Sequence, residues 1–567
     1  MLGRIVVCSL IVAAGAAWYA ERPAPTRVLP VLPGAPALVR GAIHVHTTRS
    51  DGSGDPGAVA AAAARAGLNF VIFTDHGDAT REPDPPRYVE GVLCIDAVEI
   101  STEHGHVLAL GMAEAPYPLG GEARDVLEDV ERLGGFSIAA HADSPKPELQ
   151  WTDRDVSVGG LEWLNADSEW RDESFASLTR ALLLYPVYGS SALITLLDRP
   201  VSVLQHWDDV TMERRVVGVA ASDAHARLGI RSLGEPDGTG SALHLPSYEN
   251  TFRMFSNVLA STTLSGDAQA DARTVLDAVR NGRVYSVIDA AAGPVALEFT
   301  AASGSATASM GDRLAVTEAA TIRIRASGPD DVETVLIGNG EIVQSTVGRT
   351  LDYVGPDTPT PTAYRVEVRL PNAPGNPPVP WIVSNPIYVG LGAAGAVTAP
   401  VPPKPTSIAV QYGDGPATAW TVEHSAASLG ALEEIPTVGG QQLSLRYALG
   451  GTASASPFAA FVMPAGPNLA AYDRLTFTGR SDHPIRVSVQ VREPGDGAGQ
   501  RWHRSVYLEP EPREITVFFA DMRPRGTTST PRPNLANVQS ILFVLDTVNT
   551  PLGSNGTLWL DDIRYAK

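Results

Sequence analysis

The first half of the chain alternates short apolar runs with stretches of helical periodicity. The clearest helix opens at Asp55-Pro56, where an N-cap residue precedes a proline suited to the first turn, and it ends at Gly67. Further helices are expected over Glu122–Leu133, across much of 171–210, and from an N-cap at Asp271 to Asn281-Gly282. The apolar runs predict strands at Val39–Val45, Phe70–Thr74, Val92–Ile100, Val107–Leu110, Phe136–Ala140, Leu161–Leu164 and Arg215–Ala221. Strands that alternate with helices predict parallel βα units, and hence an α/β domain over residues 38–292.

From about residue 293 the pattern changes to alternation of apolar and polar residues with a period of two. Examples are Thr321–Arg325, Tyr364–Val368, Ile485–Val489 and Ile541–Leu545. This pattern predicts an Ig-like β-sandwich over 293–392 and a jelly-roll sandwich over 408–567, joined by an Ala-, Gly- and Pro-rich linker at 393–407. The fold class expected is therefore multidomain, α/β first and all-β afterwards.

Residues 1–20 have the pattern of an export segment. Arg4 precedes an uncharged, mostly apolar run of 13 residues from Ile5 to Ala17, and a Pro-rich linker follows over 21–37. The run is short for a membrane span, which favours a cleaved signal peptide, whereas Trp18 and Tyr19 at the interface would make it an uncleaved signal anchor. Both interpretations predict an exported body that is periplasmic, extracellular or membrane-anchored facing outside, with membrane contact only through this segment if it is uncleaved.

The composition of the chain limits which ligands it can bind and which kinds of metal site it can contain. The 567 residues carry 43 Lys and Arg against 63 Asp and Glu, a net charge of −20, which argues against general nucleic-acid binding. The two cysteines are Cys8, inside the N-terminal segment, and Cys94, so the body has neither a disulfide framework nor a thiolate metal cluster. Any metal site must be built from His, Asp and Glu.

Such residues gather at the ends of the predicted strands in the first half. They are His44, His46, Asp51, His76, Glu99, His106, His141, Asp223 and His225. Burying these groups together without a cation would be strongly unfavourable, because of desolvation and repulsion between like charges. Imidazole with carboxylate suits Zn, Mn or Fe. The pattern therefore predicts a metal cluster at the carboxyl ends of the strands, the face that carries active sites in βα-barrels.

Four segments of this set resemble the motifs of the PHP (polymerase and histidinol phosphatase) family. They are Ile43–Gly52, Phe73–His76, Val98–Ile100 and Ser222–His225, in the family's order and within under half of the chain. The resemblance implies a distorted (β/α)7 TIM-like barrel that holds two to three divalent ions, Zn, Mn or Fe. It implies one ion at His44, His46, Glu99 and Asp223, a second at Glu99, His106 and His141, and a third at Asp51, His76 and His225. Asp51 departs from the family pattern, since a His often stands there, and His104 competes with His106.

The resemblance also implies the reaction, hydrolysis of phosphomonoesters or phosphodiesters by a metal-bridging hydroxide. Asp223 would carry a proton while ligating a metal, and His104 is either a pocket acid/base or a surface residue. Arg49, Lys146 and Arg227 are candidate substrate contacts, since cationic side chains suit phosphate, and each is otherwise a solvated surface residue. Arg81, Arg154 and Arg231 lie near the same motifs.

Other functions stay open. Arg280–Tyr285 is similar to a stretch of exported, carbaryl-hydrolase-like members, in which the same site would cleave carboxylic or carbamic esters. A non-catalytic binding protein on a vestigial barrel is a third interpretation, although no ligand position is lost. The last segment is similar to galactose-binding-like carbohydrate modules. We expect there either a glycan or cell-envelope ligand or an inert spacer, with Trp420, Trp502 and Trp559 stacking on sugars or packing in the core.

Overall fold

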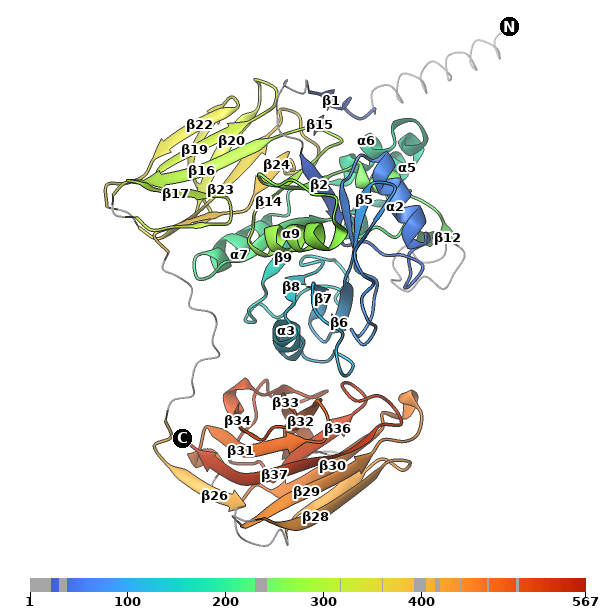
Figure 1. Cartoon of the computed structure of the whole chain (residues 1–567), viewed down its shortest axis with the longest axis vertical. Helices are drawn as coiled ribbons and strands as arrows, with labels where there is room; N and C mark the ends of the chain where they lie inside the picture. The colour runs from blue at the N-terminus through green and yellow to red at the C-terminus, as the bar shows by residue number, and fades with distance from the viewer. Residues whose placement is uncertain are drawn as a thin grey trace. The chain divides into compact units, whose positions relative to one another are not determined.

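The computed structural model describes residues 22–29, 38–229, 242–316, 318–358, 360–391, 404–412, 419–437, 440–466, 469–495 and 499–567. The chain divides into two compact units (Figure 1). The larger unit comprises most of the first 395 residues, and the smaller comprises 396–567 with two short segments from the first half. The predicted export segment, most of both linkers, and Arg231 lie outside the described residues. Within them, no helix is both long and apolar enough to cross a membrane.

The α/β region of the larger unit contains two sheets rather than one closed barrel among its described strands. The first runs in the order β14-β13-β2-β3-β5-β4, and its strands are β2 (Val39–Ile43), β3 (Phe70–Phe73), β4 (Arg87–Val89), β5 (Val92–Asp96), β13 (Ser256–Leu259) and β14 (Val284–Val287). The second runs in the order β10-β9-β8-β7-β6, with β6 (Val98–Thr102), β7 (Gly105–Leu110), β8 (Phe136–Ala139), β9 (Gly160–Asn165) and β10 (Val217–Ala221). Isolated parallel bridges, Val45 to Ala224 and His76 to Glu99, join the two sheets.

The expectation of parallel βα units is correct for part of this region. Strands β2, β3 and β5 are parallel neighbours, as are β8, β9 and β10. In contrast, β6 pairs antiparallel with β7, because only Glu103 and His104 separate the two strands and so short a connection cannot cross over to a parallel partner. Strand β8 also pairs antiparallel with β7. The single strand expected over Val92–Ile100 is also wrong, since the chain leaves the first sheet at Ala97 and continues in the second.

Helix termini follow the expected signals, with one correction. Helix α2 (Pro56–Arg65) has Asp55 as its N-cap, whose carboxylate accepts a hydrogen bond from the Ala58 N–H at 2.9 Å. Helix α9 (Ala268–Arg280) is capped by Asp267 and not by Asp271. The Asp271 carboxylate instead accepts hydrogen bonds from the Ser265 and Gly266 N–H groups and fixes the preceding turn. The other helices of this region are α3 (Ala123–Arg132), α4 (Ala166–Arg171), α5 (Phe175–Tyr188), α6 (Ser190–Leu193), α7 (Val201–Thr211) and α8 (Tyr248–Phe252).

The central strands are buried on both faces, as parallel strands usually are. Along β3, Phe70 and Ile72 join one apolar cluster, and Val71 and Phe73 join another that contains residues of α2 and α8. Alternate side chains thus fill two cores, and the ends of these strands are held in fixed positions.

The β-sandwich that follows is continuous with this first sheet. Its four-stranded sheet contains β16 (Leu297–Ser303), β17 (Ala306–Ser309), β19 (Thr321–Ala326) and β22 (Thr350–Val354). Its other strands are β18 (Arg313–Leu314), β20 (Glu333–Gly338), β21 (Glu341–Val347), β23 (Thr362–Arg369), β24 (Ile382–Ser384) and β25 (Ile387–Val389). Strand β24 pairs antiparallel with β14, with Ser286 opposite Val383, so main-chain hydrogen bonds cross the 292/293 boundary.

The smaller unit is an all-β sandwich of two sheets. One contains β26 (Ile408–Tyr412), β28 (Leu429–Thr437), β29 (Gly440–Ala448), β31 (Arg474–Ser481), β34 (Arg513–Phe518) and β37 (Asn555–Ala566). The other contains β27 (Thr421–His424), β30 (Phe458–Pro464), β32 (Ile485–Glu493), β33 (Gln500–Leu508), β35 (Arg523–Pro524) and β36 (Ser540–Asp546).

The three tryptophans proposed for sugar stacking in this unit differ in exposure. Trp502 is fully buried and its indole N–H donates to the Thr530 carbonyl, so it has no free face for a sugar. Trp420 stacks on Phe543 against the core. Trp559 is half-buried, and the Arg480 guanidinium carbon lies 3.7 Å from its ring centroid. Trp420 and Trp559 are therefore both half-buried, and Trp559 has a cation against its ring.

Candidate metal centre

The structure brings together all nine residues that the sequence offered as metal ligands. They lie at or just beyond the ends of β2, β3, β6, β7, β8 and β10, and their ligand atoms form overlapping groups within 4.8 Å. His106 comes from the start of β7, because the antiparallel pairing of β6 with β7 places that start beside the end of β6.

The first group is formed by His44, His46, Glu99 and Asp223, all buried. The Nε2 atoms of His44 and His46 lie 3.0 Å apart, and each is 3.2 Å from Glu99 Oε2 and 3.3 Å from Asp223 Oδ1. Two imidazole nitrogens and two carboxylate oxygens therefore point at one common position.

A second group uses the other oxygen of the same glutamate. Glu99 Oε1 lies 2.7 Å from His106 Nδ1 and 2.9 Å from His141 Nε2. Glu99 thus faces two adjoining groups with its two oxygens.

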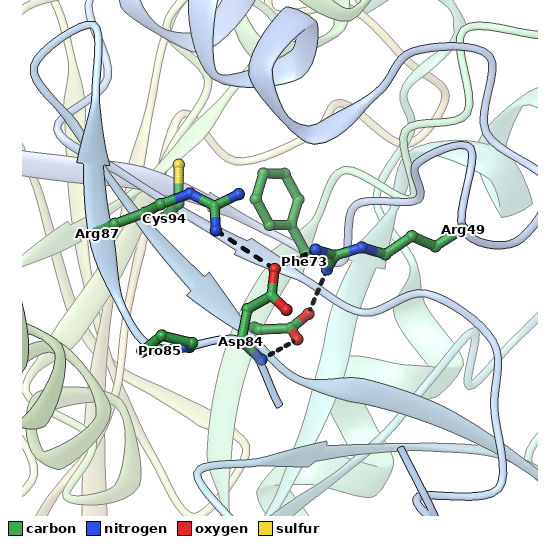
Figure 2. Close-up of a pocket in the computed structure, with 7 residues that line it drawn as sticks. Arg49, Phe73, Asp84, Pro85, Arg87 and Cys94 are labelled. Carbon is green, nitrogen blue, oxygen red and sulfur yellow. Dashed lines mark hydrogen bonds and ion pairs between the residues drawn. The ribbon is translucent and has the colours of Figure 1, made fainter. Parts of the chain in front are cut away.

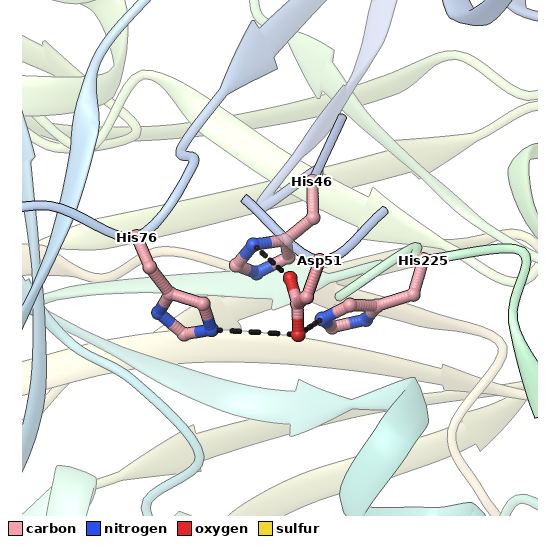
Figure 3. Close-up of side chains that lie close together, drawn as sticks. All are labelled: His46, Asp51, His76 and His225. Atoms are coloured by element: carbon pink, nitrogen blue, oxygen red, sulfur yellow. Dashed lines mark ion pairs between the residues drawn. The ribbon is translucent and has the colours of Figure 1, made fainter. Parts of the chain in front are cut away.

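The third group surrounds Asp51 and is drawn in Figure 3. Asp51 Oδ2 lies 3.1 Å from His225 Nε2 and 3.8 Å from His76 Nε2, and Asp51 Oδ1 lies 3.4 Å from His46 Nδ1. His76 also reaches the centre of the cluster, with Nδ1 3.2 Å from Glu99 Oε2. His46 and His76 therefore connect this group to the other two.

Three residues of the cluster adopt a backbone conformation that non-glycine residues rarely use. His44, His141 and Asp223 have φ of 66°, 40° and 41°. Such conformations cost free energy and persist where surrounding contacts impose them. Here the Ser222 hydroxyl donates to the His44 carbonyl at 2.8 Å, and the His46 N–H donates to the Ala224 carbonyl at 3.1 Å. The strand ends are therefore tied to each other where the candidate ligands leave them.

Sequence reasoning missed a buried pair beneath the cluster, Glu162 and Asn165 of β9. Glu162 Oε1 lies 2.6 Å from His44 Nδ1, and Glu162 Oε2 accepts hydrogen bonds from the His141 N–H at 2.7 Å and from Asn165 Nδ2 at 2.8 Å. Asn165 Nδ2 also lies 3.2 Å from Asp223 Oδ2. A carboxylate on Nδ1 directs the His44 Nε2 lone pair towards the first group, the usual arrangement behind a metal-binding histidine.

A second support holds the loop that follows β2. The Asp75 carboxylate accepts hydrogen bonds from the Thr47 N–H and hydroxyl and from the Ser50 hydroxyl, at 2.7–2.8 Å. The Tyr248 hydroxyl donates to the His46 carbonyl at 2.9 Å. These contacts fix the path of the chain from His46 to Asp51.

Interactions between the clustered histidines and carboxylates shift the pKa values of these side chains. Burial would raise the pKa of Glu99, but the neighbouring His44, His141 and His76 hold it well below its usual value. Burial would lower the pKa of His141, but the charge of Glu99 and its hydrogen bond raise it to about 9. Burial opposes the rise for His225 too, and its hydrogen bond with Asp51 brings its pKa to about 9.

The residues fit divalent metal ions. Asp223 Oδ1 is buried and has no hydrogen-bond partner, although two imidazole nitrogens lie 3.3 Å away. Mixed imidazole and carboxylate sets of this kind are the ligands that Zn, Mn and Fe take. The cluster therefore contains several buried groups, each able to hold an ion, and the donor atoms leave the identity of the metal open.

The candidate catalytic and substrate residues are more scattered. His104 lies in the turn between β6 and β7, with Nδ1 3.1 Å from the Thr152 hydroxyl. Arg227 is close to the cluster, since its Nη1 lies 3.4 Å from the Asp51 carbonyl oxygen. Lys146 Nζ lies 4.0 Å from Glu148 Oε1.

Arg49 lines a small separate pocket with Phe73 and Cys94 (Figure 2). Its guanidinium binds two carboxylates, Asp96 at 3.0 Å and Asp84. Protein acids therefore already engage the cation that the sequence offered as a phosphate contact.

Comparisons with known proteins add limited information. No family model and no curated protein matches the chain. Among solved structures, it resembles the family 11 carbohydrate-binding module of a cellulosomal cellulase of Clostridium thermocellum, at 15% identity over 28% of this chain and 94% of the module, with a TM-score of 0.25. It also resembles a family 30 carbohydrate-binding module (14%, 28% and 99%, TM-score 0.21) and an exo-β-agarase (13%, 28% and 25%, TM-score 0.20). TM-scores this low support no inference about ligands.

Proposed function

We propose that this protein is an exported, metal-dependent phosphoesterase of the PHP type that hydrolyses phosphomonoesters or phosphodiesters. One observation carries the proposal: three groups of His and carboxylate atoms adjoin one another, with Glu99 common to the first and second groups and with His46 and His76 linking the third to them. Adjoining sites of this kind can hold two or three cations close enough to act on one ester group. The distorted (β/α)7 barrel belongs to the same proposal, with the two bridged sheets as its wall.

The protein's own residues would have distinct tasks. His44, His46, Glu99 and Asp223 would hold one ion, Glu99, His106 and His141 a second, and Asp51, His76 and His225 a third. When bound, such ions activate water for attack and neutralise negative charge that develops on the ester oxygens. Asp223 would relay the proton of the attacking water while it ligates the first ion.

Substrate contacts are assigned by proximity to the cluster. Arg227 lies beside the Asp51 group and is the best placed of the three candidate cations to bind a phosphate oxygen. His104 and Lys146 remain proposals for a proton donor and a second cation. Arg49 has a positioning role instead, because Asp84 and Asp96 hold it.

That engagement of Arg49 favours a second candidate, a carboxylic or carbamic ester hydrolase. A neutral ester needs fewer cations around the site than a phosphate does, and the same ion-activated water could attack a carbonyl carbon. Glycan binding at the all-β unit is a separate proposal, for which Trp559 is the residue to test.

The deciding experiment is a paired hydrolysis assay on the full chain. A nitrophenyl phosphodiester and a nitrophenyl carboxylic ester are compared with added Mn or Zn and with chelator, for the wild type, His44→Ala and His206→Ala. His206, on α7, is the matched control because it lies outside the nine candidate ligands. We expect chelator-sensitive turnover of the phosphodiester, lost by at least about 100-fold in His44→Ala and kept in His206→Ala.

Other outcomes would redirect the assignment. Turnover of the carboxylic ester alone would establish the second candidate. Equal rates for His44→Ala and the wild type would contradict both enzyme proposals and favour a binding protein.

A further inference from the structure

Helix α5 presents an apolar stripe to solvent, the reverse of an ordinary surface helix. Its exposed positions are Phe175, Ala176, Thr179, Leu183, Pro186 and Val187, which contain no charge. Phe175, Leu183 and Val187 are 78%, 69% and 65% exposed. At 3.6 residues per turn these positions fall within an arc of about 120° along about 18 Å of helix. Ala181, Leu184 and Tyr185 face the core instead.

The charge of this helix is also unlike that of the rest of the chain. Over Phe175–Tyr188 the one charged residue is Arg180, and no acid occurs, in a protein of net charge −20. A surface that must approach anionic lipid has to lack acids, because the headgroups repel them. An apolar face that carries Phe and Leu and no acid suits contact with a membrane interface, and here the opposite face packs on the core.

The N-terminal segment enters the fold beside this helix. The Thr26 hydroxyl lies 3.3 Å from the Ser191 hydroxyl, on α6 immediately after α5, and donates to the Ala290 carbonyl at 2.8 Å. Strand β1 (Arg27–Val28) then pairs with β15 (Ala292–Gly293), and Val28 is 85% exposed (Figure 1). Thr26 lies nine positions after Ala17, the end of the apolar run, which allows a reach of at most about 30 Å. A bilayer holding the run would therefore lie within reach of Val187.

We propose that residues 1–20 stay attached as the signal anchor and that the stripe on α5 rests on the outer face of the lipid bilayer that holds this anchor. The apolar side chains then leave water for the acyl boundary, and the tether raises their local concentration at the surface. A second copy of this chain fits the stripe less well. A stripe about 18 Å long and about 10 Å wide covers far less than the roughly 800 Å² per partner that stable protein interfaces bury.

The test measures lipid contact at one position of the full chain. Leu183→Cys, in a Cys8→Ser background, carries an environment-sensitive fluorophore, and the protein is reconstituted into phosphatidylethanolamine–phosphatidylglycerol vesicles with spin-labelled lipid. Cys94 stays unlabelled, because it is buried and burial raises its pKa to about 11. Val347→Cys on β21 is the matched control, being 78% exposed in the same unit.

We expect lipid quenching at position 183 to exceed that at position 347 by at least about twofold, and Val187→Glu to remove the difference. Equal, weak quenching at both positions would overturn the proposal. So would a concentration-dependent dimer that Val187→Glu abolishes without any lipid quenching, since the occupant would then be a second copy.

Discussion

At the scale of single residues, Glu162 links three parts of the candidate metal centre. Replacing it with Gln leaves an acceptor for His44 Nδ1 but turns an amide donor towards the His141 N–H and Asn165 Nδ2, both donors themselves. We expect Glu162→Gln to weaken Zn or Mn binding by about 10- to 100-fold, the usual effect of losing the partner behind a metal ligand. Competition with a metal-sensitive dye measures it. Glu148→Gln, on a side chain 60% exposed, should leave affinity unchanged, and an equal loss there would show that charge alone matters.

Glu169 makes a separate contribution to the pH dependence of stability. It is buried on α4, and its carboxylate accepts the Asp198 N–H at 2.7 Å. Burial and then the charges of Asp172, Asp143 and Asp198 raise its pKa to about 9, from about 4.3 in the unfolded chain. The folded state therefore keeps a proton that the unfolded state has released, so the contribution of Glu169 to stability is greatest below about pH 4.3 and falls as pH rises towards 9.

Glu169→Gln removes that loss while keeping an acceptor oxygen. We expect its unfolding free energy to exceed that of the wild type by about 1 kcal/mol at pH 5 and by about 3–5 kcal/mol at pH 8.5. Denaturant titrations at the two pH values provide the comparison, with Glu173→Gln as control. A gain of the same size at pH 5 would refute the role assigned to the proton.

The sequence predicted the candidate ligands better than the residues that support them. Most of the nine candidate ligands lie at or beyond the ends of apolar runs, His106 lies at the start of one, and the structure brings all nine together. Glu162 lies inside β9, between Leu161 and Trp163, and its partner His44 is 118 positions away. A carboxylate inside a buried run signals that a partner must exist, but the partner itself is set by tertiary packing.

At the scale of elements, a buried ion network joins α7 to the sandwich strand β23. Arg365, 2% exposed, binds Asp208 of α7 through two hydrogen bonds of 2.6 and 2.7 Å, and also binds Glu367 at 2.8 Å. Asp208→Asn leaves the buried guanidinium partly uncompensated, and we expect a loss of about 3–5 kcal/mol in unfolding free energy. Asp209→Asn, on the exposed side of the same helix, should cost little. Chemical denaturation compares the two, and similar losses would mean that helix charge, not the network, is responsible.

Local signals predicted most elements but not how they pair. Asp55-Pro56 correctly located the start of α2, because capping depends on neighbouring residues. Asp267 and Asp271 offer the same chemistry four residues apart, and only the turn at Ser265 and Gly266 distinguishes them. The transfer of the chain from β5 to β6 at Ala97 was missed, because no turn residue interrupts Val92–Ile100 and the segment fits one extended strand.

At the scale of the whole molecule, the change of pattern at residue 293 marks a change in the kind of strand, but one sheet continues across this boundary. Strand β24 of the sandwich hydrogen-bonds to β14 of the α/β region, and Trp381 donates its indole N–H to the Ala292 carbonyl. Main-chain pairing is independent of side-chain identity, so composition could not reveal that the sheet continues.

This continuity predicts how the full chain melts. The α/β region and the first sandwich should unfold together as one transition, and the all-β unit of 404–567 should unfold as another. If the cluster at Glu99 binds metal in the folded state alone, free metal at 1,000 times its dissociation constant should stabilise the first transition by about 4 kcal/mol and leave the second unchanged. Calorimetry of the full chain with Zn or Mn and with chelator tests this.

Two variants assign the transitions to their units. Asp208→Asn should lower the midpoint temperature of the transition that chelator also lowers. Trp502→Ala, which opens a cavity in the core of the all-β unit, should lower the midpoint temperature of the second transition alone. If metal moved both transitions together, or neither, the pairing of metal centre with larger unit would be wrong.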